Sequence, residues 1–161
     1  MEHIRRIGFV CLGNIGRSPL AEHLFRHLVR QKGIDARYET TSAGTSSRYI
    51  GYPYDEHMVR LAARHGLVYK GFARQFQRAE LGLLDLILSM DVQNWAFLTA
   101  MASKPEQLEK VHLLREFDPQ GGKFAAVPDP YQQSQEKYEE VYEMIARSVR
   151  GLVENLETDF V

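Results

Sequence analysis

The 161-residue sequence has a single cysteine, Cys11, so no disulfide can form within the chain. No apolar run approaches the roughly 20 residues that cross a bilayer, and the first residues lack the apolar segment of a secretory signal. The formal net charge is only −1 at pH 7, which provides no broad basic field for nucleic acid or anionic membrane. We therefore expect a cytoplasmic protein with neither of these partners.

What the sequence does contain is the composition of an ordinary globular domain. It is 44% hydrophobic and 25% charged, and we find no internal repeat and no low-complexity segment. A chain of about 150 residues buries roughly 68 to 70% of its unfolded surface, which is enough for a substantial core. We expect one domain over residues 1–161.

Strand-like and helical patterns alternate along the chain. Short runs rich in β-branched residues predict strands at 4–10, 38–42, 84–89 and 110–114, and apolar residues three and four apart predict helices at 19–32, 55–64, 92–102 and 134–156. The last helix has an apolar stripe, expected to be core: Tyr138, Val141, Tyr142, Ile145, Val149, Leu152 and Leu156. This alternation predicts a three-layer α/β fold, with a doubly wound four-stranded parallel sheet and helices on both faces. The stretches 45–54 and 118–133 are expected to be loops at the rim of a site.

Cys11 lies where the first predicted strand ends, in the segment VCLGNIGRSP. Ser18 is a good N-cap and Pro19 a good first helical residue, so residues 12–17 should curl across the helix N-terminus, which favours anions. The same field favours a thiolate, since cysteines at helix N-termini have pKa values of about 3.5 to 7.5. A lone cysteine is often only a small buried hydrophobe, but the carboxyl end of a central strand is where open α/β sheets bind ligands. We therefore expect Cys11 to be an ionised nucleophile.

The residues after Cys11 suit a phosphate. Gly13 and Gly16 permit the positive φ of a loop wrapped around an anion, and Asn14 tolerates the left-handed region. Arg17 supplies a planar fork of donors that can hold two oxygens of a phosphoryl group. We expect an oxyanion to bind here.

Two other patterns are weaker. His23 and His27 are four residues apart on a predicted helix, but no third ligand accompanies them, so we expect no metal. The loop superficially resembles a nucleotide P-loop, yet its glycines are wrongly spaced and the required lysine is replaced by Arg17. No nucleotide or other cofactor is expected.

A general acid is harder to choose from the residues alone. Asp85, Asp91 and Asp118 compete with Asp129, and most aspartates are solvated or cap helices. Prolines on both sides of Asp129 stiffen its loop, which suits a carboxyl held above a leaving group. By these arguments the choice stays open.

Five segments together resemble the low-molecular-weight protein tyrosine phosphatases. They are the Cys-x5-Arg-Ser-Pro motif that starts at Cys11, Ser-Ala-Gly-Thr at 42–45, Ala-Arg-Gln at 73–75, the strand ending in Met-Asp at 86–91, and Asp-Pro-Tyr at 129–131. They cover nearly the whole chain in the family's order. The resemblance implies the flavodoxin-like fold of the phosphotyrosine protein phosphatase I type.

The resemblance also implies a mechanism. Cys11 would attack phosphorus to form a phosphocysteine while Arg17 holds the phosphate, and Asp129 would act first as acid and then as base. Ser18 would steady the leaving thiolate, and Asn14 and Ser42 would keep the shape of the loop. Since an acid must be protonated while the thiol is ionised, the rate should be a bell-shaped function of pH.

The implied substrate is a phosphotyrosine-containing protein. Such a substrate needs apolar or aromatic walls around the loop, for which the candidates are Leu12, Ile15, Tyr49 and Tyr131. In the related protein-arginine phosphatases the resemblance leads one to expect Thr at the position of Ile15, so the isoleucine favours aryl phosphates. We expect the enzyme to act as a monomer.

The sequence departs from the family's pattern at three places. Gly16 replaces a second loop cysteine, so oxidised Cys11 has no thiol partner, and we expect sensitivity to peroxide. The Gly71–Phe72 pair replaces a histidine that supports the loop. Arg48 replaces an aromatic wall, which shifts the expected peptide preference.

Four other functions could use a cysteine loop of this kind. Arsenate reductases need further cysteines, which this chain lacks, and a phosphocarrier would want no acid such as Asp129 over the leaving group. A catalytically weakened phosphotyrosine-binding module, a protein-arginine phosphatase and, if an outside thiol serves, an arsenate reductase remain as alternatives.

Overall fold

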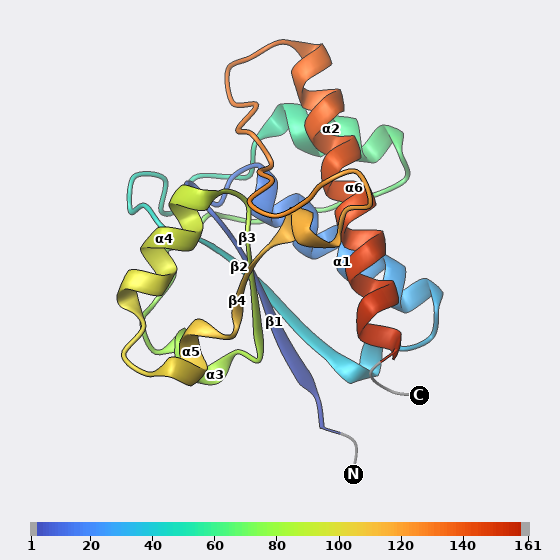
Figure 1. Ribbon diagram of the computed structural model, residues 1–161. Helices are drawn as coiled ribbons and strands as arrows, with labels where there is room; N and C mark the ends of the chain where they lie inside the picture. Colours follow the sequence, from blue (N-terminus) through green and yellow to red (C-terminus); the bar gives the residue numbers. More distant parts are fainter. Residues whose placement is uncertain (1–2, 159–161) are drawn as a thin grey trace.

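The computed structural model describes residues 3–158 and places a parallel sheet between two layers of helices (Figure 1). The strands are β1 (Arg5–Cys11), β2 (Tyr38–Gly44), β3 (Leu86–Ser89) and β4 (Val111–Leu113). Their order is β2-β1-β3-β4 and every pairing is parallel. The predicted doubly wound α/β fold is confirmed.

Helices cover both faces of the sheet (Figure 1). One face carries α1 (Arg17–Gln31), α2 (Glu56–Arg64) and α6 (Gln135–Thr158), and the other carries α3 (Glu80–Leu83), α4 (Val92–Met101) and α5 (Pro105–Leu108). Two 3-10 turns complete the chain, η1 (Asp35–Arg37) and η2 (Leu114–Phe117). All eight predicted helices and strands are present with bounds shifted by one or two residues, whereas α3, α5 and both 3-10 turns were not predicted.

Burial of both faces explains the continuous apolar run of β1. Ile7 and Phe9 pack into the core beneath α1 and α6, while Val10 belongs to the core beneath α3 and α4. The seven residues of the predicted α6 stripe are all buried, which confirms that this stripe is core. The order in which strands are added to the sheet reverses between β1 and β3, since β2 lies on one side of β1 and β3 and β4 on the other. Ligands of open α/β sheets bind at the carboxyl ends of the strands beside such a point.

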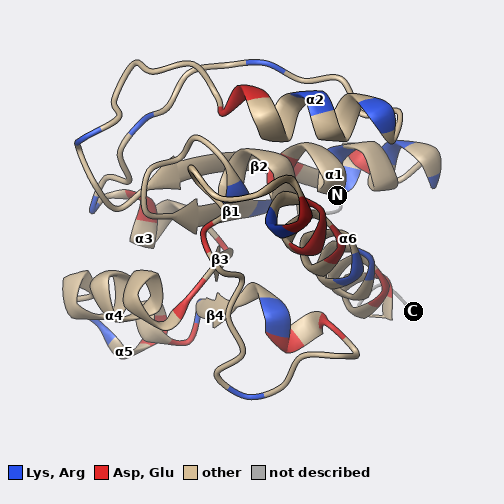
Figure 2. Ribbon diagram, turned by 90° about the horizontal axis from the view of Figure 1, so that it is seen from above, with Lys and Arg blue, Asp and Glu red and all other residues tan. Residues whose placement is uncertain are grey.

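Two features bear on the expected partners. Within residues 3–158, no helix is both long and apolar enough to span a membrane. Lys and Arg are interspersed with Asp and Glu on α1, α2 and α6, whereas α4 carries no charged residue (Figure 2). The mixed signs on the first three helices agree with the small net charge.

Asp118 fastens the loop after η2 to α6. Its buried carboxylate accepts hydrogen bonds from Arg115 Nε (3.2 Å), Arg147 Nε (3.1 Å) and the backbone N–H of Gln120 (2.9 Å). Burial by itself raises the pKa of Asp118, but the Gln120 N–H and the two guanidinium groups outweigh it and hold that pKa below its ordinary value. This aspartate is part of the scaffold and has no free oxygen for acid catalysis.

We expect Asp118→Asn to lower the free energy of unfolding by about 3 to 5 kcal/mol near pH 7, because it leaves two arginines without their buried partner. The depressed pKa means that the carboxylate stabilises the fold above its unfolded pKa of about 3.9 and loses this effect as pH falls through the folded value. Urea unfolding at pH 7 and pH 3 measures both effects. The difference in free energy of unfolding between wild type and variant should be smaller at pH 3 than at pH 7. An equal difference at both pH values would contradict this account.

Candidate active site

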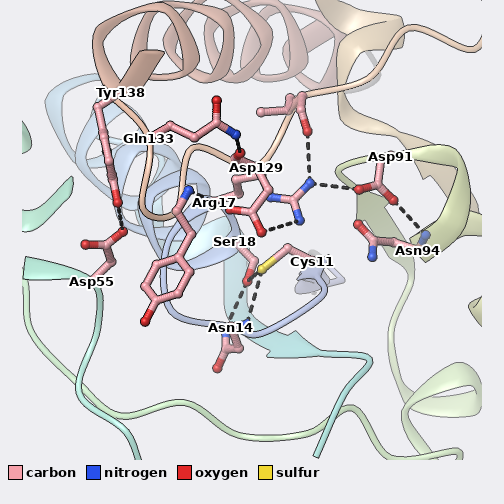
Figure 3. Close-up of polar contacts among 12 residues, drawn as sticks. Cys11, Asn14, Arg17, Ser18, Asp55, Asp91, Asn94, Asp129, Gln133 and Tyr138 are labelled. Atoms are coloured by element: carbon pink, nitrogen blue, oxygen red, sulfur yellow. Dashed lines mark hydrogen bonds and ion pairs between the residues drawn. The ribbon is translucent and has the colours of Figure 1, made fainter. Parts of the chain in front are cut away.

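Cys11 is the last residue of β1, and its side chain lies at the start of the loop that leads into α1. It is buried, and its sulfur is 3.0 Å from Ser18 Oγ and accepts the backbone N–H of Asn14 at 3.3 Å (Figure 3). Both contacts can stabilise negative charge on sulfur. The lone cysteine therefore lies at the carboxyl edge of the sheet, where it adjoins the core and its sulfur also contacts polar groups of the loop.

The start of α1 differs from the prediction. The helix begins at Arg17 with Gly16 as its N-cap and no side-chain cap, so the prediction of Ser18 as N-cap and Pro19 as first helical residue is wrong. The hydroxyl of Ser18 is instead directed at Cys11 and Asn14. Contacts within the site therefore take this serine away from capping.

The loop also takes its shape differently than expected. Asn14, with φ of +56°, is the loop residue in the left-handed region, whereas Gly13 and Gly16 are not, so the positive φ expected for the glycines is wrong. Gly13 is needed for space, since a Cβ there would lie 2.8 Å from the ring of Tyr49. At Gly16 a Cβ would meet no atom closer than 3.9 Å, so the glycine is not required by space.

Asn14 ties the loop to β2 and to residue 74. Its Nδ2 donates to Ser18 Oγ (3.0 Å) and to Ser42 Oγ (3.1 Å), and its Oδ1 accepts the backbone N–H of Arg74 (2.9 Å). The Asn14 side chain is buried, so its amide is satisfied by protein groups. Gly71 and Phe72 precede Ala-Arg-Gln in this chain, where the resemblance led us to expect a histidine that supports the loop. On this side the loop is held by the backbone N–H of Arg74, which donates to the Asn14 side chain.

Arg17 is buried and held from one side. Its Nη1 donates to Asp91 Oδ2 (2.8 Å) and to the carbonyl oxygen of Val127 (2.9 Å), while its Nη2 lies 3.8 Å from Asp129 Oδ2. Burial lowers the pKa of Arg17, but attraction to Cys11 and the carboxylates of Asp91 and Asp129 outweighs it and raises that pKa above its ordinary value. The guanidinium is a fixed cation beside the sulfur.

The four candidate aspartates have different positions. Asp129 projects over the loop with a half-exposed carboxyl, whose Oδ1 accepts the backbone N–H of Tyr131 at 3.1 Å (Figure 3). Asp91 is occupied by Arg17 and caps α4 through the N–H of Asn94. Asp85 accepts the backbone N–H of Arg6 at the opposite end of the strands. Of the four, only Asp129 borders the sulfur with a carboxyl open to solvent.

A small pocket of about 40 Å³ opens above Cys11. Its lining is Cys11, Leu12, Gly13, Ile15, Gly16, Arg17, Tyr49, Asp129 and Tyr131. The rings of Tyr49 and Tyr131 are 6.0 Å apart at its mouth, and the guanidinium of Arg48 lies 5.3 Å from the Tyr49 ring. Three of the predicted residues, Asn14, Ser18 and Ser42, lie behind this lining and support the loop.

Larger hollows lie elsewhere. A groove of about 690 Å³ between α1 and the segment after α2 is lined by His23 and His27, and it holds no nucleophile. His23 stacks on Tyr69 at 4.9 Å, and burial and the neighbouring arginines 26 and 30 lower the pKa of His23 despite Glu22. No group of three or more His, Cys, Asp or Glu side chains suited to a metal is found among the described residues.

Three residues contribute to this site in ways that no sequence pattern predicted. Asp91 was considered only as a rival acid, whereas it orients Arg17. Tyr138 was predicted only as a core residue and Asp55 only as the start of a helix, yet Tyr138 donates its hydroxyl to Asp55 Oδ2 beside the loop. No local pattern marks a pair that is 83 residues apart.

Known proteins are similar to this chain in sequence and in fold. Residues 6–161 match the family model described as low molecular weight phosphotyrosine protein phosphatase. A low molecular weight protein-tyrosine-phosphatase of Streptomyces coelicolor is 38% identical over 149 residues, covering 92% of this chain and 91% of that protein.

Two solved structures are similar over almost their full length. A protein tyrosine phosphatase from Entamoeba histolytica, crystallised with Hepes in its active site, has a TM-score of 0.90 and 25% identity, and the match covers 98% of this chain and 99% of that one. YfkJ from Bacillus subtilis has a TM-score of 0.88 and 32% identity, with coverage of 97% and 96%. The chain belongs to the low molecular weight phosphotyrosine protein phosphatase family and is a hydrolase that acts on phosphorylated protein.

Proposed function

We propose that this phosphatase hydrolyses phosphotyrosine through a phosphocysteine formed on Cys11. The observation that carries the proposal is the joint placement of Cys11, Arg17 and Asp129 on the lining of one small pocket. A nucleophile, a phosphate-binding cation and an acid are the groups that such a displacement requires.

The phosphate would bind across the N-terminal end of α1. Backbone N–H groups of residues 12–17 and the free edge of Arg17 would hold its equatorial oxygens. The 3.8 Å contact between Arg17 Nη2 and Asp129 is long enough to be replaced by a phosphate oxygen. The Hepes bound in the Entamoeba relative carries a sulfonate, which has the same tetrahedral arrangement of oxygens and supports this assignment.

Two steps would follow. The thiolate of Cys11 attacks phosphorus as the bond to the phenolic oxygen breaks, and Asp129 gives its proton to that oxygen. Water then attacks the phosphocysteine, Asp129 takes a proton from it, and the thiolate leaves. Ser18 Oγ, 3.0 Å from the sulfur, would donate to the departing thiolate, while Asn14 and Ser42 keep the loop in place.

The pocket walls favour an aryl phosphate. Leu12, Ile15, Tyr49 and Tyr131 border the opening above the sulfur and offer apolar and aromatic contact to a phenyl ring. Arsenate reduction would need further thiols, and Cys11 is the chain's one cysteine. A pure binding module would not need an acid over the pocket.

We further propose that the chain acts as a single cytoplasmic domain, monomeric and independent of metal. Every group in the proposed mechanism comes from one copy of the chain, between positions 11 and 131. The supporting loop contacts come from the same copy.

We expect Asp129→Ala to lower the rate of phosphocysteine formation from a phosphotyrosine peptide by about 10²- to 10⁴-fold, because the phenolate would leave without a proton. The loss should be much smaller with para-nitrophenyl phosphate, whose phenolate is a weaker base. Rapid-quench measurement of the first turnover on both substrates gives the comparison. Asp85→Ala, at the far end of the strands, serves as control, and equal losses on both substrates in Asp129→Ala would exclude the acid role.

A further inference from the structure

Asp55 joins two parts of the site that carry different roles. It is the N-cap of α2, where its Oδ1 accepts the N–H of His57 at 3.0 Å. Its other oxygen, Oδ2, accepts the hydroxyl of Tyr138 at 2.5 Å (Figure 3). Capping needs only one oxygen, so the second oxygen makes a separate link to α6.

On one side, Asp55 contacts the phosphate-binding loop. Its backbone N–H donates to the carbonyl oxygen of Ile15 at 2.7 Å. A Cβ on Gly16 would lie 3.9 Å from Asp55 Oδ2, which places the carboxylate directly behind the loop. The position of Asp55 is therefore tied to the position of the loop that holds phosphate.

On the other side, Tyr138 belongs to the segment that carries Asp129. It lies in the first turn of α6, where its N–H donates to the Ser134 carbonyl oxygen at 3.2 Å. Gln133 Nε2 donates to the carbonyl oxygen of Asp129 at 2.9 Å. The backbone N–H of Gln133 donates to the carbonyl oxygen of Pro130. Residues 129–134 thus form one turn that is continuous with the start of α6.

The Tyr138 hydroxyl is suited to act as a permanent donor. Burial, the hydrogen bond to Asp55 and the charge of Asp55 raise the pKa of Tyr138 above its ordinary value, and the backbone of Gln132 offsets only part of this. The phenol therefore stays protonated across the working pH range of a phosphatase.

The carboxyl of Asp129 has few contacts of its own. Its carboxyl is half exposed, and its described partners are the N–H of Tyr131 within the same turn and the 3.8 Å contact with Arg17. The height of the carboxyl over Cys11 therefore depends on where the whole turn is anchored.

We propose that Tyr138 and Asp55 are positioning residues, whose hydrogen bond sets the distance between the acid turn and the phosphate-binding loop. This inference rests on the proposed role of Asp129 as general acid. The link acts through Asp129 and makes no contact with the substrate.

Tyr138→Phe is the direct test, because it removes the hydroxyl and keeps the buried ring. The expected result is a loss of about tenfold in the first-turnover rate with a phosphotyrosine peptide, with less than a twofold loss with para-nitrophenyl phosphate, since displacement of the acid affects only the poorer leaving group. Tyr142→Phe is the matched control, since Tyr142 is also buried on α6 but stacks on His65 and does not contact Asp55. Equal losses on both substrates, or none, would overturn the proposal.

A double-mutant cycle separates this inference from the proposed function. If Asp129→Ala loses far more rate on the phosphotyrosine peptide than on para-nitrophenyl phosphate, and adding Tyr138→Phe to Asp129→Ala causes no further loss, both hold. If Asp129→Ala behaves as expected but Tyr138→Phe changes neither substrate, the inference alone fails. Asp55→Ser, which retains a capping hydroxyl but cannot reach Tyr138, should reproduce the selectivity change of Tyr138→Phe and provides the test if that variant folds poorly.

Discussion

Replacing Cys11 with serine is expected to lower turnover of a phosphotyrosine peptide by at least about 10⁴-fold, a loss of the size seen when a covalent nucleophile is removed. The thiolate is the nucleophile in cysteine chemistry, and a serine hydroxyl in the same place has no adjacent base to ionise it. The nearest side-chain partner of the sulfur is another hydroxyl, Ser18 Oγ at 3.0 Å, which supplies no such base.

Binding of phosphate should survive the same substitution. The loop N–H groups and Arg17 are unchanged in Cys11→Ser, and a neutral hydroxyl in place of the proposed thiolate would not repel the dianion. Calorimetric titration with inorganic phosphate is expected to give a dissociation constant equal to or lower than that of the wild type. Asp85→Ala, at the far end of the strands, serves as the control that retains the thiol and the loop. Residual turnover in Cys11→Ser within tenfold of wild type would contradict the nucleophile assignment.

Arg17→Lys is expected to lower kcat/KM by about 10³-fold, in the range found for transition-state arginines in phosphoryl transfer. The guanidinium donates to Asp91 and to the Val127 carbonyl oxygen at the same time as it faces the pocket. A lysine offers one compact charge and cannot hold these partners and two phosphate oxygens together.

Steady-state kinetics with a phosphotyrosine peptide measures this loss in kcat and KM separately. Arg74→Lys is the matched control, because its guanidinium binds Glu80 and Thr41 while the contact to Asn14 comes from its backbone. We expect the control to stay within a few-fold of wild type. A loss in Arg17→Lys no larger than in the control would show that a simple positive charge is sufficient.

The main elements of the fold could be predicted because their patterns depend on burial. β1 is buried on both faces and reads as a continuous apolar run, and the α6 stripe at spacings of three and four is buried throughout. The short helices α3 and α5 have four residues each, too few for a periodic pattern to register. The 3-10 turns were missed for the same reason.

Errors at the site came from residues whose side chains serve the site instead of the local backbone. Ser18 has the character of an N-cap, but Asn14 and Cys11 recruit its hydroxyl and the helix begins at Arg17. The positive φ expected for Gly13 and Gly16 is found instead at Asn14, whose residue type tolerates it, because the buried amide of Asn14 must reach Ser42 and the backbone N–H of Arg74. These side-chain contacts depend on the tertiary structure, so the local propensity of each residue does not predict them.

The choice among the aspartates shows the same limit. Asp91, Asp118 and Asp129 are alike as residue types, and only the structure separates their roles. Asp91 orients Arg17, and Asp118 is bound to Arg115 and Arg147. The carboxyl of Asp129 is open to solvent above the pocket. The resemblance to a family favoured Asp129 before any geometry was available. The contact of Tyr138 with Asp55 has no counterpart in the sequence pattern.

The central claim is that phosphate passes through the sulfur of Cys11. Acid quenching of the enzyme during turnover of a phosphotyrosine peptide, followed by mass spectrometry of its proteolytic peptides, tests this claim most directly. We predict that one phosphoryl group is found on the peptide that contains Cys11, in the first turnover and at steady state. Absence of that adduct at every quench time, together with intact turnover in Cys11→Ser, would contradict the account.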